Sequence, residues 1–146
     1  MTRKIKCTLF VLLVALTQVL AQAPNIINYQ GVALNTGGTP IANQTITIRV
    51  SIHDATANGT VVFSEDRAVT TDASGLFDLQ IGSPGSVNNF GTLNNVAWYN
   101  SPKFLRVKMD PAGGVNYVDM GTQQLASVPY ALNAKSASSL TPDAVV

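Results

Sequence analysis

The stretch Gln44–His53, QTITIRVSIH, alternates apolar and polar side chains over ten consecutive residues. Successive side chains of a β-strand point to opposite faces, so one face of this segment is apolar and the other is polar. The apolar set is Ile46, Ile48, Val50 and Ile52, and the polar set is Thr45, Thr47, Arg49, Ser51 and His53. The pattern predicts a strand with one face in a core and the other in solvent.

Turn-forming residues separate five further segments that favour strands. They are Ile27–Leu34, Val61–Val69, Leu76–Ile81, Lys103–Asp110 and Val115–Met120, of which Val61–Val69 has the weakest alternation. Thr71–Gly75 is predicted to be the turn of one hairpin, and Asp110–Gly114 the turn of a second.

The stretch Gly82–Ser101 is rich in Asn, Gly and Ser, but apolar residues interrupt it. We expect an ordered loop that is pinned to the core by Val87, Phe90, Leu93, Val96 and Trp98. Large aromatic side chains usually fill the core of a small domain, so Trp98 is expected to be buried and Tyr99 exposed.

Short strands and regular turns, without long helical segments between them, predict an all-β domain over residues 22–126. An antiparallel β-sandwich is the expected architecture, and a small barrel is the alternative. Ser127 is placed to cap a short carboxyl-terminal helix over residues 127–136, with Pro129 in its first turn. Residues 137–146 are expected to form a flexible tail.

Residues 1–21 have the parts of a secretory signal peptide. Three basic residues lie within Met1–Lys6, an apolar run covers residues 9–16, and small residues lead to a cleavage site after Ala21. Cleavage after Ala23 also fits the rule but would leave a proline first. The apolar run is shorter than the roughly 20 residues that span a bilayer, so we expect secretion without membrane insertion.

The composition argues against several classes of function. Only 12% of the residues are charged, and the sequence has one His and one Cys. The predicted signal peptide contains Cys7 and three basic residues, so its removal leaves no cysteine and changes the net charge from +1 to −2. A nucleic-acid binder would carry an excess of basic residues. No motif for a cofactor is present.

Two resemblances add to this interpretation. Segments 31–35, 38–41 and 71–77 resemble the transthyretin-like, carboxypeptidase-regulatory type of seven-stranded sandwich; an immunoglobulin-like sandwich is also compatible with the pattern. The motifs NYQGVA, KFLRV and SVPYAL, which begin at residues 28, 103 and 127, are similar to the amino-terminal module of secreted, fibre-like proteins of Bacteroidota-type bacteria.

The second resemblance implies an extracellular, non-catalytic head or base of a fibre. In that family the module often precedes a collagen-like or tail-fibre-like stalk, which is often trimeric. We therefore expect protein partners or self-association through Val128, Tyr130 and Leu132 of the predicted helix. A helix this short is marginal by itself in water, so it would depend on such contacts.

Reactive side chains are few and lack catalytic spacing. His53 is expected to be a solvated surface group, and the serines lie in no nucleophile-elbow motif. Glu65 and Asp66 are adjacent, so on a strand they point to opposite faces and cannot flank one cleft. We expect no enzymatic activity and no metal centre. Calcium at Asp72 or Asp110 is a minor alternative, because no Asp-x-Asp repeat is present.

Aromatic side chains supply an alternative function, since Tyr99 and Tyr117 are candidates for stacking on surface glycans. The sequence favours a secreted, non-catalytic β-sandwich that serves as a structural or interaction module at the bacterial cell surface. A carbohydrate-binding module that uses exposed aromatics is the alternative.

Overall fold

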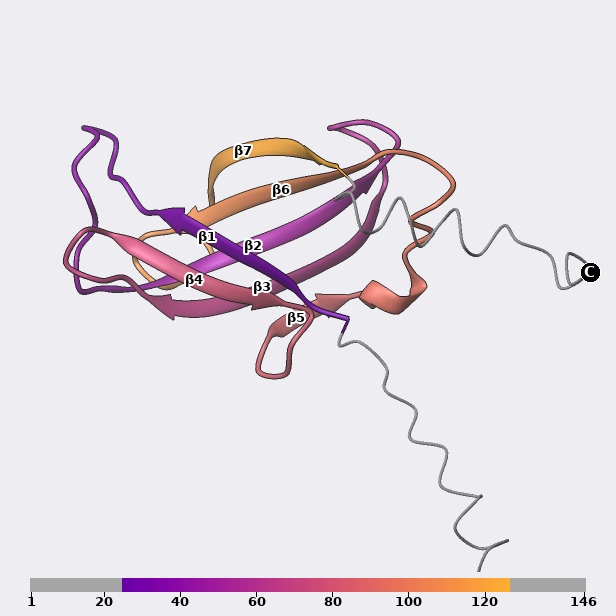
Figure 1. The fold of residues 1–146 in the computed structure, drawn as a ribbon. Helices are drawn as coiled ribbons and strands as arrows, with labels where there is room; N and C mark the ends of the chain where they lie inside the picture. Colours follow the sequence, from indigo (N-terminus) through magenta and orange to yellow (C-terminus); the bar gives the residue numbers. More distant parts are fainter. Residues whose placement is uncertain (1–24, 127–146) are drawn as a thin grey trace, which may run out of the picture.

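The computed structural model describes residues 25–126, which fold into two antiparallel β-sheets (Figure 1). The elements are β1 (Ile27–Val32), β2 (Thr45–Asp54), β3 (Val61–Thr70), β4 (Leu76–Ile81), β5 (Val87–Phe90), the 3-10 helix η1 (Leu93–Asn95), β6 (Lys103–Asp110) and β7 (Val118–Leu125). The predicted all-β, antiparallel architecture is confirmed for this part of the chain. It contains no helix long and apolar enough to cross a membrane.

The larger sheet has the strand order β5-β3-β2-β6-β7, which places β2 at its centre. The smaller sheet consists of β1 and β4, which lie across one face of the larger sheet (Figure 1). No strand of one sheet pairs with a strand of the other within residues 25–126. The sandwich-like arrangement is therefore open, and the alternative of a small barrel is wrong.

The apolar face of β2 forms the centre of the core, as its alternation predicts. Its four aliphatic side chains are at most 1% exposed. They cluster with buried residues of β3, β4, β6 and the segment after β5, namely Phe63, Phe77, Leu79, Ile81, Leu93, Val96, Leu105, Val107 and Met109. Burial of this apolar surface is the main force that holds the two sheets together.

The turn Thr71–Gly75 does not close a hairpin, which corrects the prediction. Asp72 accepts hydrogen bonds from the N–H groups of Ser74 (2.7 Å) and Leu76 (2.9 Å), and Gly75 has a φ of 77°. The turn itself therefore forms as its residues indicate. However, β4 pairs with β1, so the chain crosses here from the larger sheet to the smaller one. A local turn motif does not specify which strand the next segment will pair with.

The second predicted hairpin is confirmed, because β6 and β7 pair antiparallel. Its second strand is Val118–Leu125 and not Val115–Met120. The Asp110 carboxylate accepts hydrogen bonds from the N–H groups of Ala112 and Asn116, both at 2.8 Å. These bonds hold the chain in a wide loop and delay the start of β7.

The stretch between β4 and β6 is ordered, but only some of its apolar residues reach the core. Leu93 and Val96 are buried, whereas Val87 and Phe90 on β5 are each 58% exposed. β5 lies at the edge of the larger sheet, so the exposed side chains of this strand have no second layer to pack against. The predicted signal peptide, carboxyl-terminal helix and tail lie outside the described residues.

Candidate binding sites

The second face of β2 is polar, and the neighbouring strands β3 and β6 flank it. The register places Arg49 beside Asp66 of β3 and Lys108 of β6. It likewise places Ser51 between a serine of β3 and an arginine of β6. We call this surface the polar face; its residues are Thr47, Arg49, Ser51, His53, Ser64, Asp66, Arg106 and Lys108.

Part of the polar face is buried, although the sequence predicts it to be solvated. Thr47 and Ser51 are each 9% exposed, and His53 is 7% exposed. β2 is the central strand, so long side chains of the two flanking strands cover its small polar groups. The alternation showed which residues share a face but not how many strands flank it.

An ion pair fixes the centre of the polar face. Arg49 donates from Nε to Oδ1 of Asp66 at 2.6 Å and from Nη2 to Oδ2 at 2.7 Å, and Asn88 donates to Oδ2 at 2.8 Å. The Asp66 side chain is 1% exposed and that of Arg49 is 38% exposed. Burial acts to raise the pKa of Asp66, but the hydrogen bonds from Arg49 and Asn88 outweigh it and hold that pKa below its ordinary value.

Tyr117, a predicted sugar-stacking residue, lies against this ion pair. The guanidinium carbon of Arg49 is 4.3 Å from the centre of the Tyr117 ring, within the range of a cation–π contact. The Tyr117 hydroxyl is buried, it has no hydrogen-bond partner among residues 25–126, and burial raises its pKa. One ring face of Tyr117 is therefore already used to orient Arg49.

The structure brings Ser51 and His53 together, which the sequence analysis did not foresee. Oγ of Ser51 lies 3.0 Å from Nε2 of His53, and Nδ1 of His53 lies 2.9 Å from the carbonyl oxygen of Gly59. A carbonyl only accepts, so in the neutral imidazole Nδ1 carries the proton and Nε2 accepts from the Ser51 hydroxyl. The prediction of a solvated His53 is wrong, because the turn at Gly59 closes over the ring. The Ser-x-His spacing on a strand was the signal available.

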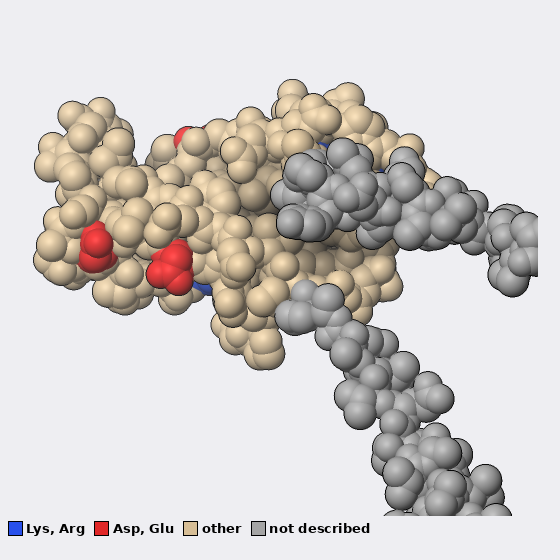
Figure 2. Space-filling model, viewed as in Figure 1, with Lys and Arg blue, Asp and Glu red and all other residues tan. Residues whose placement is uncertain are grey.

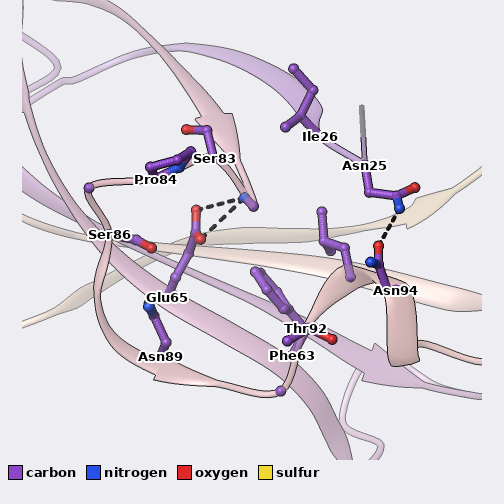
Figure 3. Close-up of a pocket in the computed structure, with 14 residues that line it drawn as sticks. Asn25, Ile26, Phe63, Glu65, Ser83, Pro84, Ser86, Asn89, Thr92 and Asn94 are labelled. Atoms are coloured by element: carbon purple, nitrogen blue, oxygen red, sulfur yellow. Dashed lines mark hydrogen bonds between the residues drawn. The ribbon is translucent and has the colours of Figure 1, made fainter. Parts of the chain in front are cut away.

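A second candidate site is a pocket of about 640 Å³ at the β3–β5 edge, which we call the edge pocket (Figure 3). Figure 3 shows Glu65 inside it, between Ser83 and Pro84 on one side and Asn89 on the other. The lining residues outside the core are mostly amides, hydroxyls and glycines: Asn25, Gly82, Ser83, Gly85, Ser86, Asn89, Gly91, Thr92 and Asn94. Such groups both donate and accept hydrogen bonds.

The Glu65 carboxylate anchors the wall of the edge pocket. It is 2% exposed, accepts the N–H of Gly82 at 3.2 Å on each oxygen, and pairs with Nε of Arg67 at 2.6 Å. Arg67 also donates to the carbonyl oxygens of Ser83 and of Pro84, the latter at 3.3 Å. No second carboxylate lines the pocket within residues 25–126, so the pair of acids that glycoside hydrolysis needs is not formed there.

Sequence reasoning missed this anchor. In the register with β2, Glu65 and Arg67 occupy core-facing positions, which is why the alternation of Val61–Val69 looks weak. A Glu and an Arg two residues apart on one strand face was the signal that an ion pair replaces apolar contacts here. Glu65 and Asp66 do face opposite sides of the sheet, as predicted, because Asp66 lies on the polar face.

The aromatic pair before β6 differs in part from the prediction. Tyr99 is 83% exposed, which confirms its expected exposure. Trp98 is 43% exposed, so the prediction that it is buried is wrong. Its indole N–H donates to the carbonyl oxygen of Leu93 at 3.1 Å, and its ring borders a recess of about 290 Å³ beside Ile26 and Ile27. Trp98 covers the core edge without entering it.

The aspartates considered for calcium bind their own turns. Asp72 and Asp110 each accept two backbone N–H groups, and these bonds hold the pKa of Asp110 below its ordinary value. Within residues 25–126 no three His, Cys, Asp or Glu side chains gather closely enough to hold a metal ion. The proposed assembly residues Val128, Tyr130 and Leu132 lie outside the described part of the chain.

The fold and these sites define an all-β domain in which the buried charges of residues 25–126 are paired with one another or with backbone groups. The chain belongs to the family described as Domain of unknown function (DUF8740), whose family model matches residues 28–125. No curated protein and no solved structure matches the chain. The matched range begins within β1 and ends with β7, so it coincides with the described domain.

Proposed function

We propose that this chain is a secreted, non-catalytic β-sandwich that serves as a structural or interaction module at the bacterial cell surface, as the head or base of a fibre. The two sheets with seven strands are compatible with a transthyretin-like sandwich and with an immunoglobulin-like one. In this proposal, residues 1–21 direct export, and the segment after residue 126 continues toward partners.

The observation that carries the proposal is the position of the two ends of the domain. β1 begins at Ile27, opposite the end of β4, and β7 ends at Leu125, opposite Lys103. Lys103 also pairs with Asp54, so the end of β7 lies close to the end of β2. Figure 1 shows the start of β1 at this same end of the domain. We call it the chain-end pole. The turns at the opposite pole are free for contacts, as a head or base module requires.

The Ser51–His53 contact is the strongest argument for an enzyme, and its surroundings oppose that role. A serine hydrolase holds its imidazole with a carboxylate, which stabilises the imidazolium formed during catalysis. Here Nδ1 of His53 meets the neutral carbonyl of Gly59. Arg49, Arg106 and Lys108 share the recess with His53, so a positive ring would face further positive charge. We therefore assign Ser51 and His53 a structural role in closing the β2–β3 turn.

Cell fractionation with an antibody against the folded domain tests export. The proposal predicts the chain in the cell-surface or culture fraction with Gln22 as its first residue. A chain that stays in the cytoplasm with residues 1–21 attached would contradict it.

An activity assay tests the absence of catalysis. The full chain and its Ser51→Ala and His53→Ala variants are incubated with panels of chromogenic esters and glycosides. We expect no turnover above buffer in any of the three. Turnover by the wild type that both variants lose, with unchanged circular dichroism, would overturn the non-catalytic assignment.

A carbohydrate-binding module is the second candidate, and the edge pocket is the observation that favours it. Its amide and hydroxyl lining suits sugar hydroxyls, and Tyr99, which is 83% exposed, offers a separate stacking ring. A glycan array with the wild type, Asn89→Ala and Tyr99→Ala separates the two sites. Binding lost in one variant with the fold preserved would support this candidate, and binding to no glycan would exclude it.

A further inference from the structure

A recess of about 320 Å³ opens on the polar face between β2, β3, β5 and β6. Three of the five basic residues within residues 25–126 line it, namely Arg49, Arg106 and Lys108. The same part of the chain has seven Asp and Glu residues, so an excess of basic residues does not explain the clustering. Figure 2 shows the opposite face, over β1 and β4, where acidic groups are visible and basic ones are almost absent.

The cations of the recess occupy neighbouring positions of β2 and β6. Arg49 and Lys108 are direct cross-strand partners, and like charges at such positions repel. Asp66 and Asp119 pair with Arg49 and Arg106 respectively. Lys108 has no ion pair within 4.0 Å among the described residues, so three cations meet two counter-ions.

The two arginines of the recess are held in position before any ligand arrives. Two bonds to Asp66 and the ring of Tyr117 fix the guanidinium plane of Arg49. Within residues 25–126, Nη1 of Arg49 and Nη1 of Arg106 make no hydrogen bond, and the hydroxyl of Ser64 makes none either. Donors fixed in this way lose little conformational entropy on binding.

We propose that this recess binds a small oxyanion, that is, a carboxylate, sulfate or phosphate group, either free or carried on a sugar. Arg49, Arg106 and Lys108 supply the charge, and guanidinium groups match the oxygens of such anions in geometry. The volume lies at the small end of the roughly 300–1,000 Å³ range of ligand sites, which suits one charged group and little more. This inference is independent of the proposed function.

Amide NMR titration of the full chain tests the proposal, with sodium sulfate, inorganic phosphate, glucuronate and glucose as probes at constant ionic strength. We expect the anions to shift resonances of β2, β3 and β6, and glucose to leave them unchanged. Equal affinity for sulfate and glucuronate would show recognition of the charged group alone, and tighter glucuronate binding would add sugar contacts; both support an oxyanion site. Absent shifts, or shifts by glucose equal to those by glucuronate, would overturn it.

Charge variants sharpen the test. Lys108→Gln is expected to weaken anion binding about tenfold, the typical effect of losing one charge-assisted hydrogen bond. Asp119→Asn is expected to strengthen it, because Arg106 loses its competing partner.

Asp78→Asn is the matched control, since it removes the same charge from an exposed position on β4 of the other sheet. It should leave the affinity unchanged. Equal strengthening by Asp78→Asn and Asp119→Asn would reduce the effect to net charge and overturn the site. Ser64→Ala, a change without charge, is expected to weaken binding and serves if a charge variant fails to fold.

Discussion

Replacing Glu65 by Gln tests whether the ion pair in the wall of the edge pocket supports the fold. The substitution keeps the shape of the side chain and one oxygen that can accept the N–H of Gly82. It removes the negative charge that faces Nε of Arg67 at 2.6 Å. The arginine side chain is 11% exposed, so water compensates little for the lost partner.

The size of the effect follows from this geometry. Removing one partner of a buried ion pair costs about 3–5 kcal/mol, because the other charge stays buried. Arg67 keeps its bonds to the carbonyl oxygens of Ser83 and Pro84, which share that charge. We therefore expect Glu65→Gln to lower the free energy of unfolding by about 2–3 kcal/mol, near the value of a hydrogen bond to a charged group.

Urea unfolding of the full chain, followed by circular dichroism, measures this loss as a shift in midpoint at constant slope. Asp78→Asn, an exposed carboxylate on β4, is the control and should change stability by less than about 0.5 kcal/mol. The double variant with Arg67→Gln should lose less than the sum of the two single losses, because they share one interaction. A loss below about 0.5 kcal/mol for Glu65→Gln, or strict additivity, would show that the Glu65–Arg67 ion pair does not support the fold.

Two further predictions concern the turn after β2 and the response to acid. Gly59→Ala should destabilise the domain by more than about 2 kcal/mol in a thermal melt, because its Cβ would lie 1.8 Å from the Asp54 carbonyl oxygen; Gly37→Ala, where the nearest contact is 3.3 Å, should change it little. Equal melting temperatures for the two variants would contradict this account of the turn. The pKa of Asp66 is lowered in the folded state, so its contribution to stability is complete above the unfolded pKa of about 3.9 and is lost as the pH falls through the folded pKa. The urea concentration at the unfolding midpoint should therefore decrease when the pH is lowered below about 4. An equally steep decrease in the Asp66→Asn variant would show that other groups cause the loss of stability.

Strand periodicity predicted the elements that lie in the core. Leu76–Ile81 and Lys103–Asp110 have the predicted bounds, and β2 is displaced by one residue at each end. Each of these strands places aliphatic side chains on a face that packs between the sheets. A one-residue slip would turn that face to solvent, so the pattern is a strong constraint.

The sequence was less informative wherever strand order decides the environment. The pairing of β4 with β1 is a tertiary feature, and it explains the missed crossover after Thr71. The burial of His53 was missed because the turn at Gly59 closes over its ring. Trp98 is exposed because its loop ends at the core edge, which no local pattern encodes. The edge pocket and the recess on the polar face also depend on which strands become neighbours.

We propose that the domain works outside the cytoplasm, on a chain that residues 1–21 export. Amino-terminal sequencing of the protein recovered from the cell-surface and culture fractions tests it most directly. The account predicts a chain that begins at Gln22 in those fractions. A chain that begins at Met1 and is confined to the cytoplasm would contradict it.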